Sequence, residues 1–446
     1  MDWTKLLSVK RLGLEDRYGE RPQTDRTEFQ RDYDRIIFSS PFRRMQNKTQ
    51  VFPLPGRIFV HNRLTHSLEV ASVGRSLGNL LADFLTKKYK LPYNALQNEI
   101  GTVVSAACLA HDLGNPPFGH SGEAAISGFF TKGAGQQFKN SLPEAEWKDF
   151  TQFDGNANAF RILTNQFNGK RPGGFALTYT TLASIVKYPF ESVNANNQKF
   201  GFFQSEKKSF YKIAEELGVR ENEQEPWTFS RHPLVCLVEA ADDICYQIMD
   251  IEDAFKLGIL PYDETRKLYL NFYDEANDTA TLENIRNTLK TVTDPNEQIT
   301  FLRAGVIGKL ISECSRIFRE NHDSILEGTF PESIIKYLNP PQADAMEHVK
   351  RISYSKVYAH RSVVEIEIAG FKIIGTLLEE FIGAAIHPNE LYSKKLNSLL
   401  PAQYKPKTDS TYDKIQAVVD FVSGMTDVYA LDLYRKIKGI NLPEIV

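Results

Sequence analysis

Long apolar segments are missing from this chain of 446 residues. No apolar run approaches the roughly 18 residues of a membrane-spanning helix, and the first residues lack the apolar core of a secretion signal. Cysteine is also scarce: the four cysteines form no CxxC pair, and three of them lie in apolar, helix-like stretches. We therefore expect reduced, buried thiols in a cytoplasmic protein that crosses no membrane.

Neither sign of charge is in large excess. Lys and Arg number 53 against 56 Asp and Glu, which leaves a net charge of -3. This balance excludes a protein whose whole surface binds nucleic acid, but it allows a local basic pocket. Hydrophobic residues make up 42% and charged residues 24% of the chain, which excludes a largely disordered protein. The length suits one large domain or two ordinary domains with a full-sized core.

Helical periodicity is the clearest feature that the sequence does contain. Apolar residues recur mostly three or four positions apart, as on the buried face of a helix, in residues 64–85, 100–109, 234–248 and 364–378. Strand signals are few, so we predict an all-α fold with at most a small β-hairpin near Phe52–Val60. The start of the last stretch alternates, which leaves a short strand as the alternative there.

Three other stretches look like breaks between helices. Residues 131–158 and 191–198 are polar and contain Gly and Asn, so we expect loops or insertions there. The run Asn339-Pro340-Pro341 would interrupt a helix before a C-terminal helical lobe.

Histidine and aspartate form the most suggestive pattern. Only nine histidines occur, and four of them lie in residues 61–120. His111 and Asp112 stand at the end of a predicted helix, where an imidazole and a carboxylate suit a divalent cation. His66, at the start of the first amphipathic helix, and Asp243, within a core-facing helix, would complete a set that leaves positions for water and a phosphate oxygen. The alternative for Asp242-Asp243 is a solvated pair of which only one member is buried.

Six segments in a fixed order make the pattern specific: Arg26–Phe52, His61–Val70, His111–Ile126, Phe153–Leu163, Lys187–Phe190 and Glu239–Ala254. Together they resemble the HD superfamily of metal-dependent phosphohydrolases, and within it the deoxynucleoside triphosphate triphosphohydrolases of the bacterial deoxyguanosine-triphosphate type. The resemblance implies an HD-domain helical fold with a C-terminal helical extension. Asn115 agrees with the bacterial members, since eukaryotic relatives carry a histidine there. An HDxxED pattern is absent from the sequence, which argues against the guanosine-tetraphosphate hydrolase branch.

The resemblance also assigns roles to individual residues. It implies that His66, His111, Asp112 and Asp243 bind a divalent metal ion, which could be Mn, Mg or another first-row transition metal. It implies that His120 and Glu123 act together in catalysis. The residues support this pairing, since Ser121 can cap a new helix with His120 and Glu123 three apart at its start. A carboxylate that accepts from one imidazole nitrogen fixes the tautomer and raises the basicity of the ring. The alternative for Glu123 is a favourable charge in a first helical turn.

A nucleoside triphosphate needs a locally positive pocket. Residues 31–63 carry seven cationic side chains against two aspartates, although several of these cations can pair with acids. Arg63 stands one helical turn before His66, and by resemblance it contacts the phosphates; Lys187 is a second candidate, or else an exposed lysine. The resemblance implies that the substrate-binding residues are Gln50, Arg63, Asn115, Lys187, Tyr246 and Asp250.

Selectivity for deoxyribose would come from three of these residues. Gln50 aligns with a glutamine beside the sugar. Tyr246 and Asp250 are four apart on one helix, so the ring could exclude a 2′-hydroxyl while the carboxylate accepts from the 3′-hydroxyl. Ordinary core packing is the alternative for Tyr246.

The function implied by the resemblance is hydrolysis of a deoxynucleoside triphosphate, with dGTP preferred, to a deoxynucleoside and inorganic tripolyphosphate. His120 would transfer a proton to the departing 5′-oxygen, with activation of the water as the alternative. The competing function is an HD-domain phosphodiesterase or phosphatase that acts on another nucleotide or on nucleic acid. A non-catalytic binding protein is disfavoured because every candidate metal and catalytic position is intact.

The division of the chain and its partners follow from the same resemblance. We expect an N-terminal substrate-binding segment of residues 1–60, an HD core of residues 61–255, a helical connector of residues 256–340 and a C-terminal helical lobe of residues 341–446. The expected partners are the dNTP substrate, further copies in a homo-oligomer, and a regulatory dNTP or single-stranded DNA. No aromatic-rich basic tract marks a nucleic-acid site.

Overall fold

The computed structural model describes residues 1–17, 26–52, 60–90, 97–195, 197–222, 228–331 and 333–441. These residues are mostly helical, which confirms the predicted all-α class. The strands among them are β1 (Glu221–Asn222) and β2 (Thr228–Phe229), paired antiparallel with Glu221 opposite Phe229. Most of the hairpin predicted near Phe52–Val60 lies outside the described residues. No helix in the described ranges is both long and apolar enough to cross a membrane.

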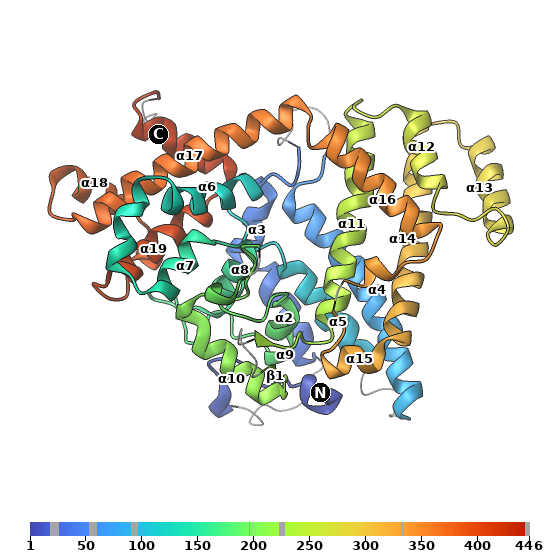
Figure 1. The fold of residues 1–446 in the computed structure, drawn as a ribbon, viewed down its shortest axis with the longest axis horizontal. Helices are drawn as coiled ribbons and strands as arrows, with labels where there is room; N and C mark the ends of the chain where they lie inside the picture. Colours follow the sequence, from blue (N-terminus) through green and yellow to red (C-terminus); the bar gives the residue numbers. More distant parts are fainter. Residues whose placement is uncertain are drawn as a thin grey trace.

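Twenty α-helices are described, in two runs along the chain (Figure 1). The first run comprises α1 (Trp3–Leu6), α2 (Glu28–Ile37), α3 (Ser40–Arg44), α4 (Arg63–Tyr89), α5 (Gln97–Ala110), α6 (His120–Thr131), α7 (Glu144–Thr151), α8 (Gly155–Thr164), α9 (Tyr179–Ile185) and α10 (Lys207–Leu217). The second comprises α11 (Val235–Lys256), α12 (Tyr262–Leu270), α13 (Thr279–Thr291), α14 (Pro295–Glu320), α15 (His322–Glu327), α16 (Gln342–Ile352), α17 (Arg361–Ile386), α18 (Leu391–Leu399), α19 (Thr411–Ser423) and α20 (Asp427–Ile437).

Helices α4, α5 and α11 form the centre of the larger hydrophobic core, and they coincide with the first three predicted helices. Helices α4 and α5 pack closely because glycines face each other across the contact. A Cβ on Gly78 of α4 would lie only 2.8 Å from the Cα of Gly101 on α5. Such close packing fixes the relative position of the residues that these helices carry at their ends.

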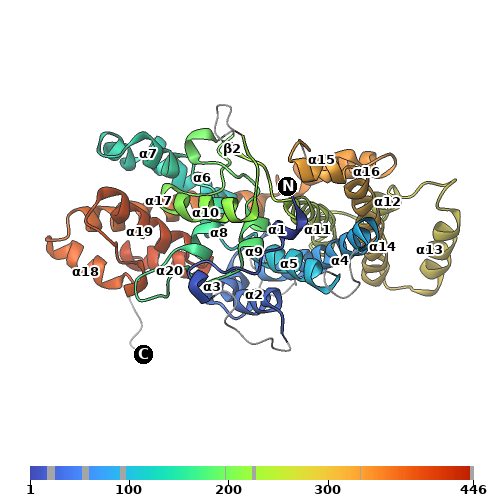
Figure 2. The same cartoon turned by 90° about the horizontal axis from the view of Figure 1, so that it is seen from below.

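A second core joins the C-terminal helices to a distant part of the chain. Its fully buried side chains include Phe130 and Phe150, on α6 and α7, and Phe381 on α17. Helix α17, the fourth predicted helix, crosses from the region of α11 and α16 to that of α6 and α19 (Figure 1). Helices α13 and α18 lie at opposite ends of the molecule in both views (Figure 1, Figure 2). The C-terminal helices therefore bury their apolar faces against α6 and α7.

The expectation of a loop over residues 131–158 is wrong. This stretch contains α7 and the start of α8. Phe138 and Phe150 are buried in the second core, so a few aromatic residues outweigh the local Gly and Asn content. Tertiary burial decides the structure here, which the local composition does not reveal.

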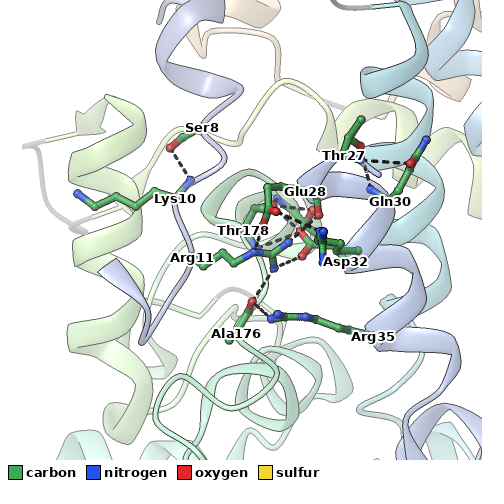
Figure 3. Close-up of polar contacts among 12 residues, drawn as sticks. Ser8, Lys10, Arg11, Thr27, Glu28, Gln30, Asp32, Arg35, Ala176 and Thr178 are labelled. Carbon is green, nitrogen blue, oxygen red and sulfur yellow. Dashed lines mark hydrogen bonds and ion pairs between the residues drawn. The ribbon is translucent and has the colours of Figure 1, made fainter. Parts of the chain in front are cut away.

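The N-terminal segment is fastened to the core by a buried arginine (Figure 3). Nη1 of Arg11 lies 2.6 Å from Oδ1 of Asp32 on α2 and donates to the carbonyl of Ala176 at 2.7 Å. The other oxygen of Asp32 accepts from the backbone and side chain of Thr178, the N-cap of α9. Since both charges are buried and paired, this network ties the N-terminal segment and α2 to the N-cap of α9.

Candidate active site

A cavity of about 540 Å³ opens between the N-terminus of α4, the turn before α6, the middle of α11 and the start of α17. Ten of the twelve residues predicted for the site line it: Gln50, Arg63, His111, Asp112, Asn115, His120, Glu123, Lys187, Asp243 and Tyr246. The remaining two, His66 and Asp250, contact residues of the lining. Residues that are widely spaced in the sequence therefore meet at one cavity.

Three of the predicted metal ligands cluster at its base. His66, His111 and Asp112 each offer a ligand atom, and these atoms lie within 4.8 Å of one another. Nδ1 of His111 contacts the carbonyl of Cys108 at 2.6 Å, so it carries the proton and leaves Nε2 as the electron-pair donor. That Nε2 is buried and makes no hydrogen bond within the described residues. A buried acceptor beside a histidine and a carboxylate fits a divalent cation.

The carboxylate of α11 that lies beside these histidines is that of Asp242, not that of the expected Asp243. Oδ1 of Asp242 lies 3.1 Å from Nε2 of His66 and 3.4 Å from Nε2 of His111. Oδ2 of Asp243 instead accepts from the hydroxyl of Ser333 at 2.8 Å. Neighbouring residues on a helix point about 100° apart, so only one of the two carboxylates can reach the histidines.

Mutual charge effects set the protonation of this cluster. Burial alone would lower the pKa of His111, but the carboxylates of Asp112 and Asp242 raise it to about 9, so Nε2 carries a proton that a bound cation would displace. Conversely, burial would raise the pKa of Asp242, and the imidazole of His111 holds it well below its usual range. For Asp243, burial outweighs the nearby Lys187 and raises the pKa to about 7. Asp242 is therefore the carboxylate that stays ionised beside the histidines.

Arg63 and Asn115 orient Asp112. Nη1 of Arg63 lies 2.7 Å from Oδ2 of Asp112, and Nδ2 of Asn115 donates to Oδ1. Arg63 is buried at the first position of α4, where Asn62 supplies a capping box. Gly119 makes room for the guanidinium, since a Cβ there would come within 2.6 Å of Nη2 of Arg63. One arginine thus touches both the metal cluster and the turn that leads to α6.

His120 and Glu123 form a hydrogen-bonded pair at the start of α6. Nδ1 of His120 lies 2.9 Å from Oε2 of Glu123, and Oε1 of Glu123 accepts from the backbone N–H of Gly155 at 2.7 Å. The hydrogen bond to Glu123 raises the pKa of His120. Glu123 is buried, whereas the His120 side chain is 76% exposed at the cavity, so its Nε2 is accessible. The expected Ser121 cap is wrong: Gly119, at φ 59°, is the N-cap, and His120 is the first helical residue.

Of the residues predicted to contact the sugar, Gln50 and Tyr246 line the cavity, and Asp250 lies behind Tyr358. Oε1 of Gln50 is buried and makes no hydrogen bond within the described ranges, so an acceptor is left for a ligand. The ring of Tyr246 stacks on that of Tyr358, with centroids 6.0 Å apart. The hydroxyl of Tyr358 donates to Oδ2 of Asp250 at 2.8 Å, and burial raises the pKa of Asp250 to about 8.

Several lining residues were missed by sequence reasoning. Tyr354, Tyr358 and Glu367 come from the C-terminal part of the chain and reach the cavity through the turn before α17 and its first turns. Lys199 also lines the cavity, 3.9 Å from Glu123 and 3.4 Å from Asp154. None of these four residues lies in the six segments that carry the resemblance.

Lys187 lies in the cavity as predicted, but it is not simply exposed. Its Nζ is 3.0 Å from Oε1 of Glu239, which also pairs with Arg231. Although burial lowers it, the Glu239 carboxylate raises the pKa of Lys187 overall, so the side chain stays cationic.

Comparison with known proteins agrees with this geometry. The family model of the HD domain matches residues 63–167, and that of the phosphohydrolase-associated domain matches residues 337–436. A deoxyguanosinetriphosphate triphosphohydrolase-like protein of Synechocystis sp. is 39% identical over 458 aligned residues, which cover 99% of this chain and 100% of the relative. The chain belongs to this family. It is therefore a hydrolase with an HD domain.

Two further relatives extend the comparison. A protein of Pseudomonas aeruginosa with the same description is 36% identical, over 99% of this chain and 100% of its own length. A deoxyguanosinetriphosphate triphosphohydrolase of Yersinia enterocolitica is 27% identical, over 92% of this chain and 93% of the relative. The HD match begins at Arg63 and spans His66, His111, Asp112, His120 and Glu123. The associated-domain match includes Tyr358 and α17–α20.

Proposed function

We propose that this hydrolase cleaves deoxynucleoside triphosphates at the α-phosphorus and releases a deoxynucleoside and inorganic tripolyphosphate, with dGTP as the preferred substrate. The observation that carries the proposal is the single cavity in which His111, Asp112 and Asp242 meet the His120–Glu123 pair and the Tyr246 wall. The descriptions of the relatives support the substrate class.

The metal ligands that we propose are His66, His111, Asp112 and Asp242, with Asp242 replacing Asp243. This set of two imidazoles and two carboxylates suits Mn, Mg or another first-row transition metal. Nε2 of His111 is buried without a hydrogen-bond partner in the described residues, so it is placed to coordinate a cation. When bound, a divalent cation supplies Lewis-acid stabilisation of the α-phosphate and an acidified water.

His120 is the proton donor in this proposal. Because Glu123 accepts from Nδ1, the Nε2–H of the imidazolium faces the cavity and can protonate the departing 5′-oxygen. Glu123 in turn is held by the N–H of Gly155, so the imidazole is oriented through a fixed carboxylate. The hydrogen bond to Glu123 raises the pKa of His120, which favours the protonated imidazole that an acid catalyst requires.

Arg63, Lys187 and Lys199 balance the charge of the triphosphate. All three cations line the cavity, and each pairs with a carboxylate in a contact that a polyanion can share. Asn115 keeps Asp112 in place. Gln50, Tyr246 and Asp250 would contact the deoxyribose, with Tyr246 excluding a 2′-hydroxyl.

The parts of the chain divide this work, in our proposal, as the resemblance suggests. Residues 1–60 contribute Gln50, residues 61–255 the metal and catalytic groups, and residues 341–446 the Tyr358 wall, with residues 256–340 as a connector. The homo-oligomer, the regulatory dNTP or single-stranded DNA, and the cytoplasmic location stay predictions.

Product analysis tests the proposal. Each of the four dNTPs and GTP is incubated with the protein in Mn²⁺, in Mg²⁺ and in chelator, and the phosphate products are separated. We expect tripolyphosphate from dGTP above the other substrates, little from GTP, and none with chelator. Orthophosphate or a nucleoside monophosphate as the product would instead favour the phosphatase or phosphodiesterase alternative. A repeat with mixed dNTPs or single-stranded DNA tests for an activator.

A further inference from the structure

One carboxylate of the C-terminal lobe accepts hydrogen bonds from two separate backbone segments of the active site, which we call the Thr49 strip and the Phe118 strip. Asp427, the first residue of α20, is buried. Its Oδ2 accepts from the backbone N–H of Thr49 at 2.8 Å, and its Oδ1 accepts from the backbone N–H of Phe118 at 3.0 Å. Both oxygens of a single side chain are therefore used to fix main-chain atoms more than 300 residues away in the sequence.

Each of these strips leads directly to a proposed functional residue. Thr49 precedes Gln50 and forms an antiparallel bridge with Asn62, the N-cap of α4, next to Arg63. Phe118 precedes Gly119 and His120, the N-cap and first residue of α6. A shift of either strip would move a side chain that lines the cavity.

The Phe118 strip needs an external restraint. Phe118 has φ 63°, in the left-handed region that a residue with a Cβ disfavours, and Gly119 follows at φ 59°. Phe118 also packs against α17, where a Cβ added to Gly370 would come within 2.8 Å of the Cβ of Phe118. Such a conformation persists only where surrounding contacts determine it, and α17 and α20 both supply them.

Two other side chains near Asp427 also link the C-terminal lobe to the backbone before α6. Nζ of Lys48 donates to the carbonyls of Asn115, at 2.6 Å, and Ser423, at 3.0 Å. Nδ2 of Asn158 donates to the carbonyl of Gly114 and to the hydroxyl of Ser423. The end of α19 is thus linked through Asn158 and Lys48 to the start of the segment from Gly114 to Phe118, and Asp427 of α20 is bonded directly to its end.

We propose that Asp427 is a positioning residue, through which the C-terminal lobe sets the backbone beside Gln50 and beside His120. Its side chain is not among those that line the cavity. The assignment rests on the proposed function for the roles of Gln50 and His120, but the contacts of Asp427 with Thr49 and Phe118 do not depend on it.

The test compares Asp427→Asn with a matched variant, Asp149→Asn. Asp149 is also a buried carboxylate bonded to a backbone N–H, that of Gln204, and to the C-terminal Tyr412, but it does not line the cavity. In Asp427→Asn, the side-chain NH2 group replaces one carboxylate oxygen and faces a backbone N–H, so one of the two hydrogen bonds is lost. Since small displacements of reacting groups are costly, we expect kcat to fall by about 100-fold with a smaller rise in KM. Asp149→Asn should keep kcat within about two-fold at a similar Tm.

Two readouts separate positioning from general damage. In the His120→Ala background, Asp427→Asn should cost less than about 10-fold in kcat, because both changes act through one group. Amide hydrogen exchange, followed in peptides that cover Thr49 and Phe118, should accelerate in Asp427→Asn and not in Asp149→Asn. The exchange experiment needs no substrate, so it tests the restraint even if the wild-type protein releases no tripolyphosphate and the proposed function fails.

The proposal is overturned by any of three results: kcat of Asp427→Asn equal to that of Asp149→Asn, unchanged exchange at both amides, or a full multiplicative loss in the His120→Ala background. If Asp427→Asn does not fold, Asp427→Ser is measured against the same criteria, since it removes the second acceptor without introducing an opposing N–H.

Discussion

Nε2 of His66 on α4 lies 3.1 Å from Oδ1 of Asp242 on α11. This contact joins the two helices through residues that are 176 positions apart in the chain. The adjacent Asp243 turns away to the hydroxyl of Ser333. Both aspartates line the cavity. They differ in what surrounds the carboxylate: two imidazoles for Asp242, a hydroxyl and the charge of Lys187 for Asp243.

This difference predicts the effect of two otherwise similar substitutions on metal binding. Asp242→Asn should weaken Mn²⁺ binding by more than about 100-fold, because it removes an ionised ligand. Asp243→Asn should change Mn²⁺ affinity by less than about 10-fold, because its carboxylate lies near the metal ligands without being one of them. Titration calorimetry of the chelator-treated variants measures both values. An equal loss in the two variants, or a larger loss in Asp243→Asn, would return the ligand assignment to Asp243.

The His120–Glu123 pair predicts a specific pH dependence of catalysis. If His120 donates a proton, kcat should fall as the pH rises through its raised pKa, because the neutral ring has no proton to give. Glu123→Gln should move this basic limb to lower pH, since the amide no longer stabilises the imidazolium. His120→Ala should lower kcat by about 100- to 10,000-fold and leave Mn²⁺ affinity unchanged. Pre-steady-state rates from pH 6 to pH 10 give the profiles. A limb that does not move in Glu123→Gln would contradict the pairing as the source of the shift.

The Tyr358–Asp250 hydrogen bond predicts a change in sugar selectivity. Tyr358→Phe removes the donor that holds Oδ2 of Asp250 but keeps the ring that stacks on Tyr246. One hydrogen bond is worth about 1 kcal/mol, so we expect the ratio of kcat/KM for dGTP over GTP to fall by about 5-fold. Tyr211→Phe is the matched control, because its hydroxyl donates to Glu191 outside the cavity. An unchanged ratio of kcat/KM for dGTP over GTP in Tyr358→Phe would show that Tyr358 does not contribute to sugar selectivity.

Much of the architecture could be predicted because it depends on local patterns. The helices α4, α5, α11 and α17 follow from apolar spacing alone. The spacing on α11 also distinguishes the two aspartates: Asp242, Tyr246 and Asp250 are four apart, so they share one face, and Asp243 lies off it. The expectation of Asp243 rested on the resemblance and on its place in a core-facing helix, and neither separates it from Asp242.

The rest could not be predicted because it depends on contacts between distant parts of the chain. The α6 N-cap is Gly119 because Arg63 and the turn at Phe118 require that geometry, not because of a local capping motif. The helix α7 forms in a stretch of poor helical signal since Phe130 of α6 and Tyr412 of α19 pack against its aromatic residues. The bonds from Asp427 to Thr49 and Phe118 have no sequence signature at all.

Lys48 predicts an unusual dependence of stability on pH. Its side chain is buried, and its Nζ donates to the carbonyls of Asn115 and Ser423. Burial, with the nearby charge of Arg44, lowers its pKa from 10.5 to about 7. Between these values the unfolded chain binds more protons at this site than the folded chain, so the contribution of Lys48 to the free energy of unfolding rises with pH. The slope is at most about 1.4 kcal/mol per pH unit.

Urea unfolding of wild-type protein and Lys48→Met in chelator, at pH 7, 8 and 9, measures this contribution as the difference between the two curves. Lys48→Met should be less stable at every pH, because two buried carbonyls lose their donor, and its deficit should widen toward pH 9. The exposed Lys372→Met should follow the wild-type curve throughout. Groups that titrate equally in all three proteins cancel from the comparison. A deficit that stays constant from pH 7 to pH 9 would mean that Lys48 is protonated throughout this range, and that the buried carbonyls, rather than the burial of the amine, decide its charge.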